Sequence, residues 1–97
     1  MVFIIYRTVE EVIRRANASD YGLGAAVMSK NIDTVNTLTR ALKAGTIWVN
    51  TFGILNPSAP FGGYKLSGFG RENGAHVLAN YQQVKSVIMP IYSPTYL

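Results

Sequence analysis

The chain has 97 residues, a length that suits one small domain, since independent domains most often contain about 100 to 150 residues. Charged residues make up 14% of it and hydrophobic residues 48%, so we expect part of its apolar surface to face another polypeptide. The net charge of +4 comes from scattered residues, which argues against nucleic-acid binding, and zero cysteines exclude disulfides, thiolate metal sites and cysteine nucleophiles.

The first 28 residues predict a strand, a helix and a second strand. Residues 2–6 form a continuous apolar run of the kind that lies buried in a parallel sheet. Thr8, followed three residues later by Glu11, is the capping-box arrangement of a helix start, and apolar residues recur behind it at helical spacing. Residues 17–22 are predicted as a polar turn, and residues 23–28 as a second short strand.

A second helix and a third strand follow. Ser29 or Asn31 can cap the helix, in which apolar residues recur at helical spacing between residues 32 and 42. Gly45 stands where a left-handed C-terminal cap belongs. The β-branched and aromatic residues 46–50 predict the third strand. The alternation of strands and helices predicts an α/β fold, with a parallel βαβαβ unit and right-handed crossovers.

The second half of the chain is dominated by a glycine-rich loop. Residues 51–70 contain five glycines and two prolines, so they are predicted as a long loop of the kind that is usually functional. A short helix is predicted at residues 75–81 and a last strand at residues 84–89, which Pro90 ends. The remaining residues are predicted as a loose tail.

No complete set of catalytic or metal-binding residues is visible in the sequence. The run Gly68–Gly74 is similar to a dinucleotide-binding fingerprint, but it follows a loop and its third glycine is one position late. The aromatic and glycine residues at 62–65 and 67–70 are also similar to those of an RNA-recognition motif. Such a motif would continue with aromatic residues along a strand, but Phe69 is followed by Gly70 and Arg71. His76 has no partner at a catalytic spacing and is predicted to lie on a helix surface.

Several motifs stand in one order along the chain. They are Tyr21-Gly22-Leu23, Ala44-Gly45-Thr46-Ile47-Trp48-Val49-Asn50, Pro60-Phe61-Gly62-Gly63-Tyr64-Lys65, Ser67-Gly68-Phe69-Gly70-Arg71-Glu72 and Lys85-Ser86-Val87. Their order and spacing resemble the C-terminal segment of the aldehyde dehydrogenase superfamily. The resemblance implies that residues 1–81 belong to a catalytic domain, that residues 82–91 form an oligomerisation strand and that residues 92–97 are a tail.

The resemblance also implies an activity and sets its limits in this chain. Enzymes of this superfamily oxidise aldehydes to carboxylic acids with NAD or NADP, through a cysteine thiolate and a glutamate that activates water. This chain has no cysteine. The resemblance places the cysteine, the glutamate and the cofactor domain upstream of Met1, so the chain alone is predicted to be inactive and to bind neither NAD nor NADP.

Binding and structural positions are implied for seven residues. Phe61 resembles the aromatic residue of the substrate tunnel, and Ile54 and Leu55 occupy variable loop positions that shape aldehyde specificity. Their aliphatic side chains suggest a roomy apolar tunnel, and ordinary core packing is the alternative for all three. Structural positions that fix the loop, with ion pairs from the two charged residues, are implied for Gly62, Gly63, Arg71 and Glu72.

The expected partners follow from the same resemblance. The chain is predicted to form homo-oligomers, and the alternative is a non-catalytic module that docks on full-length dehydrogenase subunits through its terminal strand. Nucleic acid is not expected as a partner, because the basic residues are scattered. A membrane is not expected either, because no apolar run approaches the roughly 20 residues of a membrane span. The predicted compartment is the cytoplasm, with the mitochondrion as the alternative.

Overall fold

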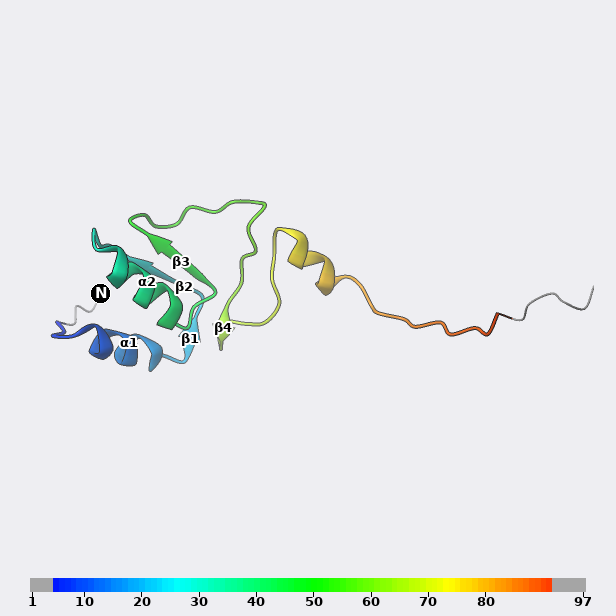
Figure 1. Ribbon diagram of the computed structural model, residues 1–97, viewed down its shortest axis with the longest axis horizontal. Helices are drawn as coiled ribbons and strands as arrows, with labels where there is room; N and C mark the ends of the chain where they lie inside the picture. The colour runs from blue at the N-terminus through cyan, green and yellow to red at the C-terminus, as the bar shows by residue number, and fades with distance from the viewer. Residues whose placement is uncertain (1–4, 92–97) are drawn as a thin grey trace, which may run out of the picture.

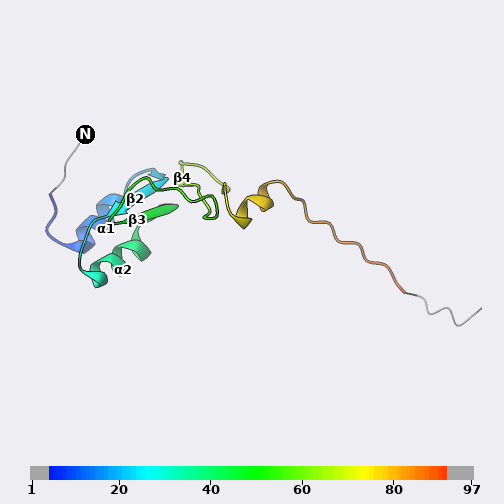
Figure 2. The same ribbon diagram turned by 90° about the horizontal axis from the view of Figure 1, so that it is seen from above.

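The computed structural model describes residues 5–91 (Figure 1). Its elements are α1 (Val9–Asn17), β1 (Tyr21–Gly22), β2 (Gly24–Val27), α2 (Ile32–Ala41), β3 (Thr46–Val49), β4 (Tyr64–Lys65) and the 3₁₀ helix η1 (Ala75–Asn80). Strands β2 and β3 are parallel and α2 connects them, which makes one βαβ unit. Helix α2 packs on β2 and α1 lies beside α2 (Figures 1 and 2). The predicted α/β class is confirmed.

Both α-helices begin at predicted caps. The Thr8 hydroxyl accepts a hydrogen bond from the Glu11 N–H at 3.1 Å, as the capping-box pattern predicts. The Glu11 carboxylate accepts from the N–H of Arg7 at 3.0 Å, one residue earlier than in the standard box. Asn31 caps α2, because its side-chain oxygen accepts from the Thr34 N–H at 3.0 Å. Local sequence therefore determines where both helices start.

The prediction of a left-handed cap at Gly45 is wrong. Helix α2 ends at Ala41, and its C-cap is Leu42, which has an extended backbone with φ −73° and ψ 129° and donates its N–H to the Leu38 carbonyl. Gly45 has no positive φ. A Cβ at residue 45 would instead overlap the carbonyl oxygen of Gly62 and lie 2.8 Å from its carbonyl carbon. Glycine is required there because the glycine-rich loop passes directly against the turn before β3.

A second, antiparallel strand pair lies where the sequence predicts a turn and a loop. Tyr21 of β1 pairs with Lys65 of β4, and Gly22 pairs with Tyr64. With two residues in each strand, no alternation of apolar and polar residues is long enough to reveal them. This pair joins the glycine-rich loop to the first half of the chain.

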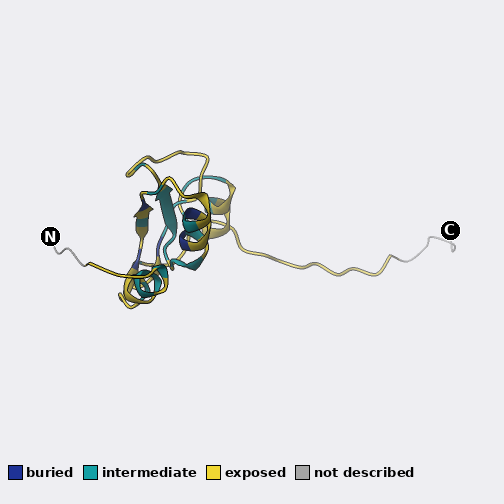
Figure 3. Cartoon of the chain, turned by 60° about the vertical axis from the view of Figure 1, so that its left-hand side comes forward, coloured by how far each residue is buried: buried dark blue, intermediate teal, exposed yellow. Residues whose placement is uncertain are grey.

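The core is small. Val27, Val35 and Leu38 are the buried hydrophobic residues of the part that the structure describes, and Figure 3 shows most of the remaining surface as exposed or intermediate. The radius of gyration is 21.6 Å, whereas a compact domain of about 100 residues has about 13 Å. Extensive apolar surface is therefore left uncovered by the chain itself.

At both ends of the described residues, the parts of the predicted strands that can be seen are not paired. Residues 2–4 of the first predicted strand and the tail at 92–97 lie outside the described residues, while Ile5 and Tyr6 are exposed and do not pair as a strand. The helix predicted at 75–81 is the six-residue 3₁₀ helix η1. Residues 82–91 extend away from the fold (Figure 1). The strand predicted at 84–89 is not formed, because no neighbouring strand among residues 5–91 offers it backbone hydrogen bonds.

Asn17 joins the C-terminal ends of the two α-helices. Its side-chain amide donates to the Ala41 carbonyl at 2.8 Å, and its side-chain oxygen accepts from the Lys43 N–H at 2.8 Å. We expect Asn17→Ala to lower the free energy of unfolding by about 2 kcal/mol, because two backbone groups lose their partners and one of them, the Ala41 carbonyl, makes a partly buried hydrogen bond. The exposed Asn36→Ala is the matched control and should stay within about 0.5 kcal/mol of the parent in a urea titration. Equal effects of the two substitutions would contradict this assignment.

Candidate functional site

The loop between β3 and β4, residues 50–63, carries the three residues that the sequence places at a substrate tunnel. It begins at Asn50, whose backbone is left-handed with φ 53°. The Asn50 side chain accepts from the Ser29 N–H at 2.9 Å and donates to the Ser29 carbonyl at 3.0 Å. The side chain thus takes the place of a backbone partner for Ser29, while the main chain turns out of the sheet.

Ile54 and Leu55 follow on the exposed part of this β3–β4 loop. The carbonyl of Ile54 accepts a hydrogen bond from the indole N–H of Trp48 at 2.7 Å. The side chains of Ile54 and Leu55 are 65% and 59% exposed, so neither is packed in the core of the chain. Ordinary core packing therefore does not account for these two aliphatic residues.

Phe61 lies at the far end of the β3–β4 loop, in a backbone bridge with Glu72. The Phe61 N–H donates to the Glu72 carbonyl at 2.8 Å, and the Glu72 N–H donates to the Phe61 carbonyl at 2.7 Å. The half-buried Phe61 lines an open pocket of about 310 Å³ together with Leu23, Phe69 and Arg71. Ile54 and Leu55 do not line this pocket. The structure of the chain therefore does not bring the three predicted tunnel residues around one cavity.

Arg71 binds carbonyl groups rather than a carboxylate. Its guanidinium donates to the carbonyls of Gly63 at 3.1 Å and Gly70 at 2.7 Å, and it lies 5.4 Å from the centre of the Tyr64 ring. The expected ion pairs of Arg71 and Glu72 are absent from residues 5–91, where Arg15 and Glu11 make the ion pair that is present. A guanidinium suits this position because its planar donors reach several carbonyls at once.

Gly62 and Gly63 are required by close contacts with the residues that follow them. A Cβ at Gly62 would lie 2.8 Å from the Arg71 Cδ, and one at Gly63 would lie 2.7 Å from the Ser67 carbonyl oxygen. Real Cβ atoms do not approach other atoms so closely, so larger residues would force the loop apart. The geometry therefore explains why glycines stand beside Phe61.

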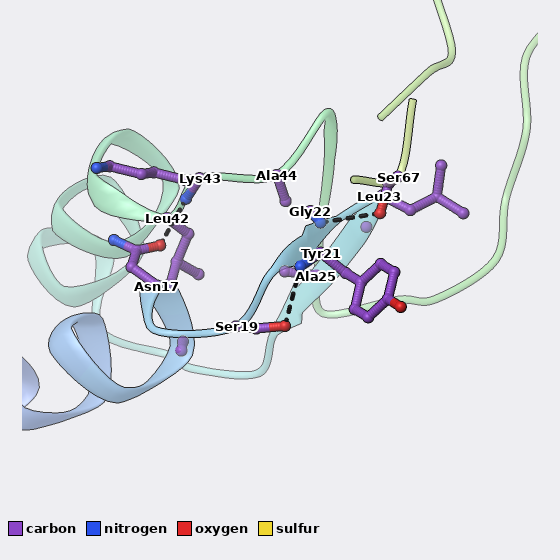
Figure 4. A pocket seen from close by; sticks show the side chains of 12 residues that line it. Asn17, Ser19, Tyr21, Gly22, Leu23, Ala25, Leu42, Lys43, Ala44 and Ser67 are labelled. Carbon is purple, nitrogen blue, oxygen red and sulfur yellow. Dashed lines mark hydrogen bonds between the residues drawn. The ribbon is translucent and has the colours of Figure 1, made fainter. Parts of the chain in front are cut away.

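Two residues to which the sequence analysis assigned no role connect the loop to α1 and β1. The Lys65 ammonium donates to the carbonyls of Asn17 at 2.9 Å and Ser19 at 2.7 Å. The Ser67 hydroxyl accepts from the Gly22 N–H at 2.9 Å, beside an open pocket of about 330 Å³ (Figure 4). These contacts join residues 45 to 48 positions apart, so no local spacing could have revealed them.

The described residues do not fit a nucleotide or metal site. In a dinucleotide-binding unit, the glycines connect a strand to an α-helix whose N-terminus faces the phosphates. Here the run Gly68–Gly74 connects a turn to the short helix η1, and Gly68, Gly70 and Gly74 all have a positive φ. Within residues 5–91 no group of three His, Cys, Asp or Glu side chains could hold a metal ion. No helix in that range has both the length and the apolarity to cross a membrane.

These residues define an α/β segment with a glycine-rich loop that presents apolar side chains. The model of the aldehyde dehydrogenase family matches residues 1–87. The chain therefore belongs to the aldehyde dehydrogenase family.

Relatives show how much of such a protein the chain covers. It is 56% identical over 92 residues to aldehyde dehydrogenase 1 of Tanacetum cinerariifolium, covering 95% of this chain and 18% of that protein. It is 52% identical to the mitochondrial benzaldehyde dehydrogenase of Antirrhinum majus, covering 95% of this chain and 17% of that protein. The NAD⁺ complex of aldehyde dehydrogenase from Bacillus cereus matches with a TM-score of 0.85 and 52% identity, over 90% of this chain and 18% of that one. The chain thus spans less than a fifth of the length of these relatives.

Proposed function

We propose that the chain functions as the C-terminal segment of an NAD(P)-dependent aldehyde dehydrogenase, in which it forms part of the wall of the substrate tunnel. The enzyme would oxidise aldehydes to carboxylic acids. The observation that carries this proposal is the β3–β4 loop, whose ends are fixed by Asn50 and by the Phe61–Glu72 bridge while Ile54 and Leu55 remain exposed. Family membership supplies the reaction class.

The tunnel assignment rests on Phe61, Ile54 and Leu55. An apolar substrate group is favoured by such side chains, because burying apolar surface stabilises a complex by roughly 25 cal/mol per Å². Phe61 already lies at the edge of an open pocket, and the two aliphatic residues have free surface to offer. The aliphatic side chains of Ile54 and Leu55 would leave more room in the tunnel than aromatic side chains, so we propose aldehydes with a bulky apolar group as substrates.

A segment exchange tests this proposal. The matching segment of the Bacillus cereus aldehyde dehydrogenase is replaced with this chain to make what we call the exchange enzyme, and NADH formation from aldehydes is followed. We expect the exchange enzyme to retain turnover within about tenfold of its parent, because a replacement at 52% identity should keep most packing contacts. A folded, cofactor-binding exchange enzyme without turnover would overturn the proposal.

The isolated chain should not turn over aldehydes. Residues 5–91 supply neither a thiolate nor a nucleotide-binding unit, and the whole sequence contains no cysteine. We expect no aldehyde-dependent NADH or NADPH formation above a buffer blank, with NAD or with NADP. Turnover that co-purifies with the chain and disappears in Phe61→Ala would contradict the assignment of the catalytic groups to other sequence.

The C-terminal residues support a second role, in assembly. Val84, Ile88 and Ile91 are 100%, 94% and 96% exposed, an unusual display of large apolar side chains on an extended segment. We propose that residues 82–91 act as an oligomerisation strand after a catalytic segment at 1–81 and before a tail at 92–97. An extended segment with free backbone groups can add to the edge of a sheet in another subunit.

The same residues support the alternative, in which the chain is a non-catalytic module that docks on full-length subunits. Size-exclusion chromatography with and without a full-length relative distinguishes the two roles. Co-elution that is lost on Ile88→Lys indicates docking, whereas self-association of the chain alone indicates a homo-oligomer. A monomer under both conditions would contradict both roles.

The compartment is proposed as the cytoplasm or the mitochondrion. The benzaldehyde dehydrogenase of Antirrhinum majus, one of the relatives, is named as mitochondrial. Fractionation of cells that produce the complete enzyme with a C-terminal tag decides between the two compartments.

A further inference from the structure

Trp48 is the only tryptophan in the chain and lies in β3, opposite Ala26 of the parallel strand β2. Its ring packs over Gly24, where a Cβ would lie 2.7 Å from the indole Cζ3. The absence of a side chain at residue 24 therefore makes the space that the indole ring occupies. The sheet holds the ring in place before any contact with the β3–β4 loop is considered.

The opposite edge of the same ring reaches the β3–β4 loop. The indole N–H donates to the Ile54 carbonyl at 2.7 Å, and the ring meets Phe52 edge-on, with centroids 5.0 Å apart and an interplanar angle of 61°. Gly53, between these two loop residues, has φ 76°, which lets the chain turn back so that the carbonyl faces the indole. In the part of the chain that the structure describes, no other hydrogen bond joins residues 51–55 to the sheet.

We propose that Trp48 is a positioning residue for aldehyde specificity, which holds the Ile54 carbonyl and thereby sets how Ile54 and Leu55 face the substrate. This inference rests on the proposed function of these two residues as tunnel positions. A backbone carbonyl fixed at residue 54 restricts the directions that the side chains of residues 54 and 55 can take, because each is attached one bond from that peptide unit. Trp48 would thus act on the substrate through the loop without touching it.

A simple packing role for Trp48 makes a different prediction. If the Trp48 ring only packed on the sheet, its hydrogen bond to the Ile54 carbonyl would have no role in the loop. Loss of the indole N–H would then lower the stability of the whole chain and would not loosen residues 52–55 in particular. Trp48→Phe separates the roles, because it keeps an aromatic ring and removes the donor. Phe52→Leu is the matched control, because it removes the edge contact and keeps the donor.

The first measurement uses the 97-residue chain and does not depend on catalysis. Trp48 gives the only indole N–H signal, so its exchange with solvent is read without ambiguity by NMR. We expect backbone order parameters of about 0.8 at residues 52–55, falling below about 0.6 in Trp48→Phe and remaining high in Phe52→Leu, while those of α2 stay unchanged. An indole N–H that exchanges as fast as in free tryptophan overturns the proposal, as does equal loosening by both substitutions.

The second measurement uses the exchange enzyme and compares a bulky aromatic aldehyde with acetaldehyde. We expect Trp48→Phe to change the ratio of the two kcat/KM values by about fivefold or more, and to leave kcat for the better substrate within about threefold, because positioning affects discrimination between substrates. An equal loss for both aldehydes indicates a structural role only and overturns the proposal. An exchange enzyme that is inactive with Trp48 intact counts against the proposed function, and the NMR result then decides the role of Trp48 alone.

Discussion

Gly45→Ala is expected to destabilise the chain by at least about 3 kcal/mol, which is a large effect for a single substitution. The new Cβ would overlap the Gly62 carbonyl oxygen, and that atom belongs to a backbone that cannot rotate away as a side chain can. Relief requires the turn before β3 and the glycine-rich loop to separate. The nearby bond from the Gly45 N–H to the Gly22 carbonyl, 3.0 Å long, would be strained at the same time.

Urea unfolding followed by circular dichroism and by Trp48 fluorescence measures this loss. Gly53→Ala is the matched control, because residue 53 has φ 76° but no atom within 4 Å of the added Cβ. It should cost about 1 to 2 kcal/mol from backbone strain alone. A Gly45→Ala variant as stable as the control would show that the close contact between residues 45 and 62 is not present in solution.

Phe61→Ala in the exchange enzyme is expected to lower kcat/KM for an aromatic aldehyde by about 10- to 100-fold. Loss of a buried aromatic side chain removes about 1.5 to 3 kcal/mol of transfer free energy from any complex that covers it. Acetaldehyde has little apolar surface to bury, so its kcat/KM should fall less. The measurement is initial-rate kinetics with both aldehydes at saturating NAD.

Tyr81→Ala serves as the control for this substitution. Tyr81 is also aromatic, its side chain is 84% exposed and it does not line the pocket at Phe61, so its removal leaves no cavity in the chain. We expect changes within about twofold for both aldehydes. Equal losses for Phe61→Ala and Tyr81→Ala would remove the support for a specific role of Phe61 in the tunnel.

The sequence predicted those elements whose signals are local. The structure confirms the Thr8 cap, Asn31 as one of the two candidate caps, the apolar spacing of α2 and the β-branched residues of β3. Each of these signals acts within a few positions. The loop was also recognisable, because many glycines and prolines in a short stretch prevent regular structure over most of its length. The order of the motifs then predicted the family, and the model of that family matches residues 1–87.

Contacts between distant residues could not be predicted. Gly45 reads locally as a helix cap, but the atom that requires glycine there belongs to residue 62. Lys65 binds carbonyls near residue 17, and β1 and β4 pair across more than 40 positions. The strand expected at 84–89 failed for a different reason. Its residues have strand propensity, but pairing requires a neighbouring strand, and residues 5–91 do not provide one.

The sequence predicted which residues belong to the candidate site, but it did not predict a cavity that they share. The part of the chain that the structure describes places Phe61 at one pocket and leaves Ile54 and Leu55 exposed elsewhere on the β3–β4 loop. In the proposed enzyme, other sequence would close the space between them. The same reasoning accounts for the small core and for the apolar side chains at the C-terminus.

A crystal structure of the exchange enzyme with NAD⁺ and a bound aromatic carboxylic acid product tests the tunnel assignment most directly. The account predicts that Phe61 and at least one of Ile54 and Leu55 lie within about 4.5 Å of the product's apolar group. It also predicts that the indole N–H of Trp48 still donates to the Ile54 carbonyl. A product bound in a correctly folded active site, with none of these three side chains in contact with it, would contradict the account.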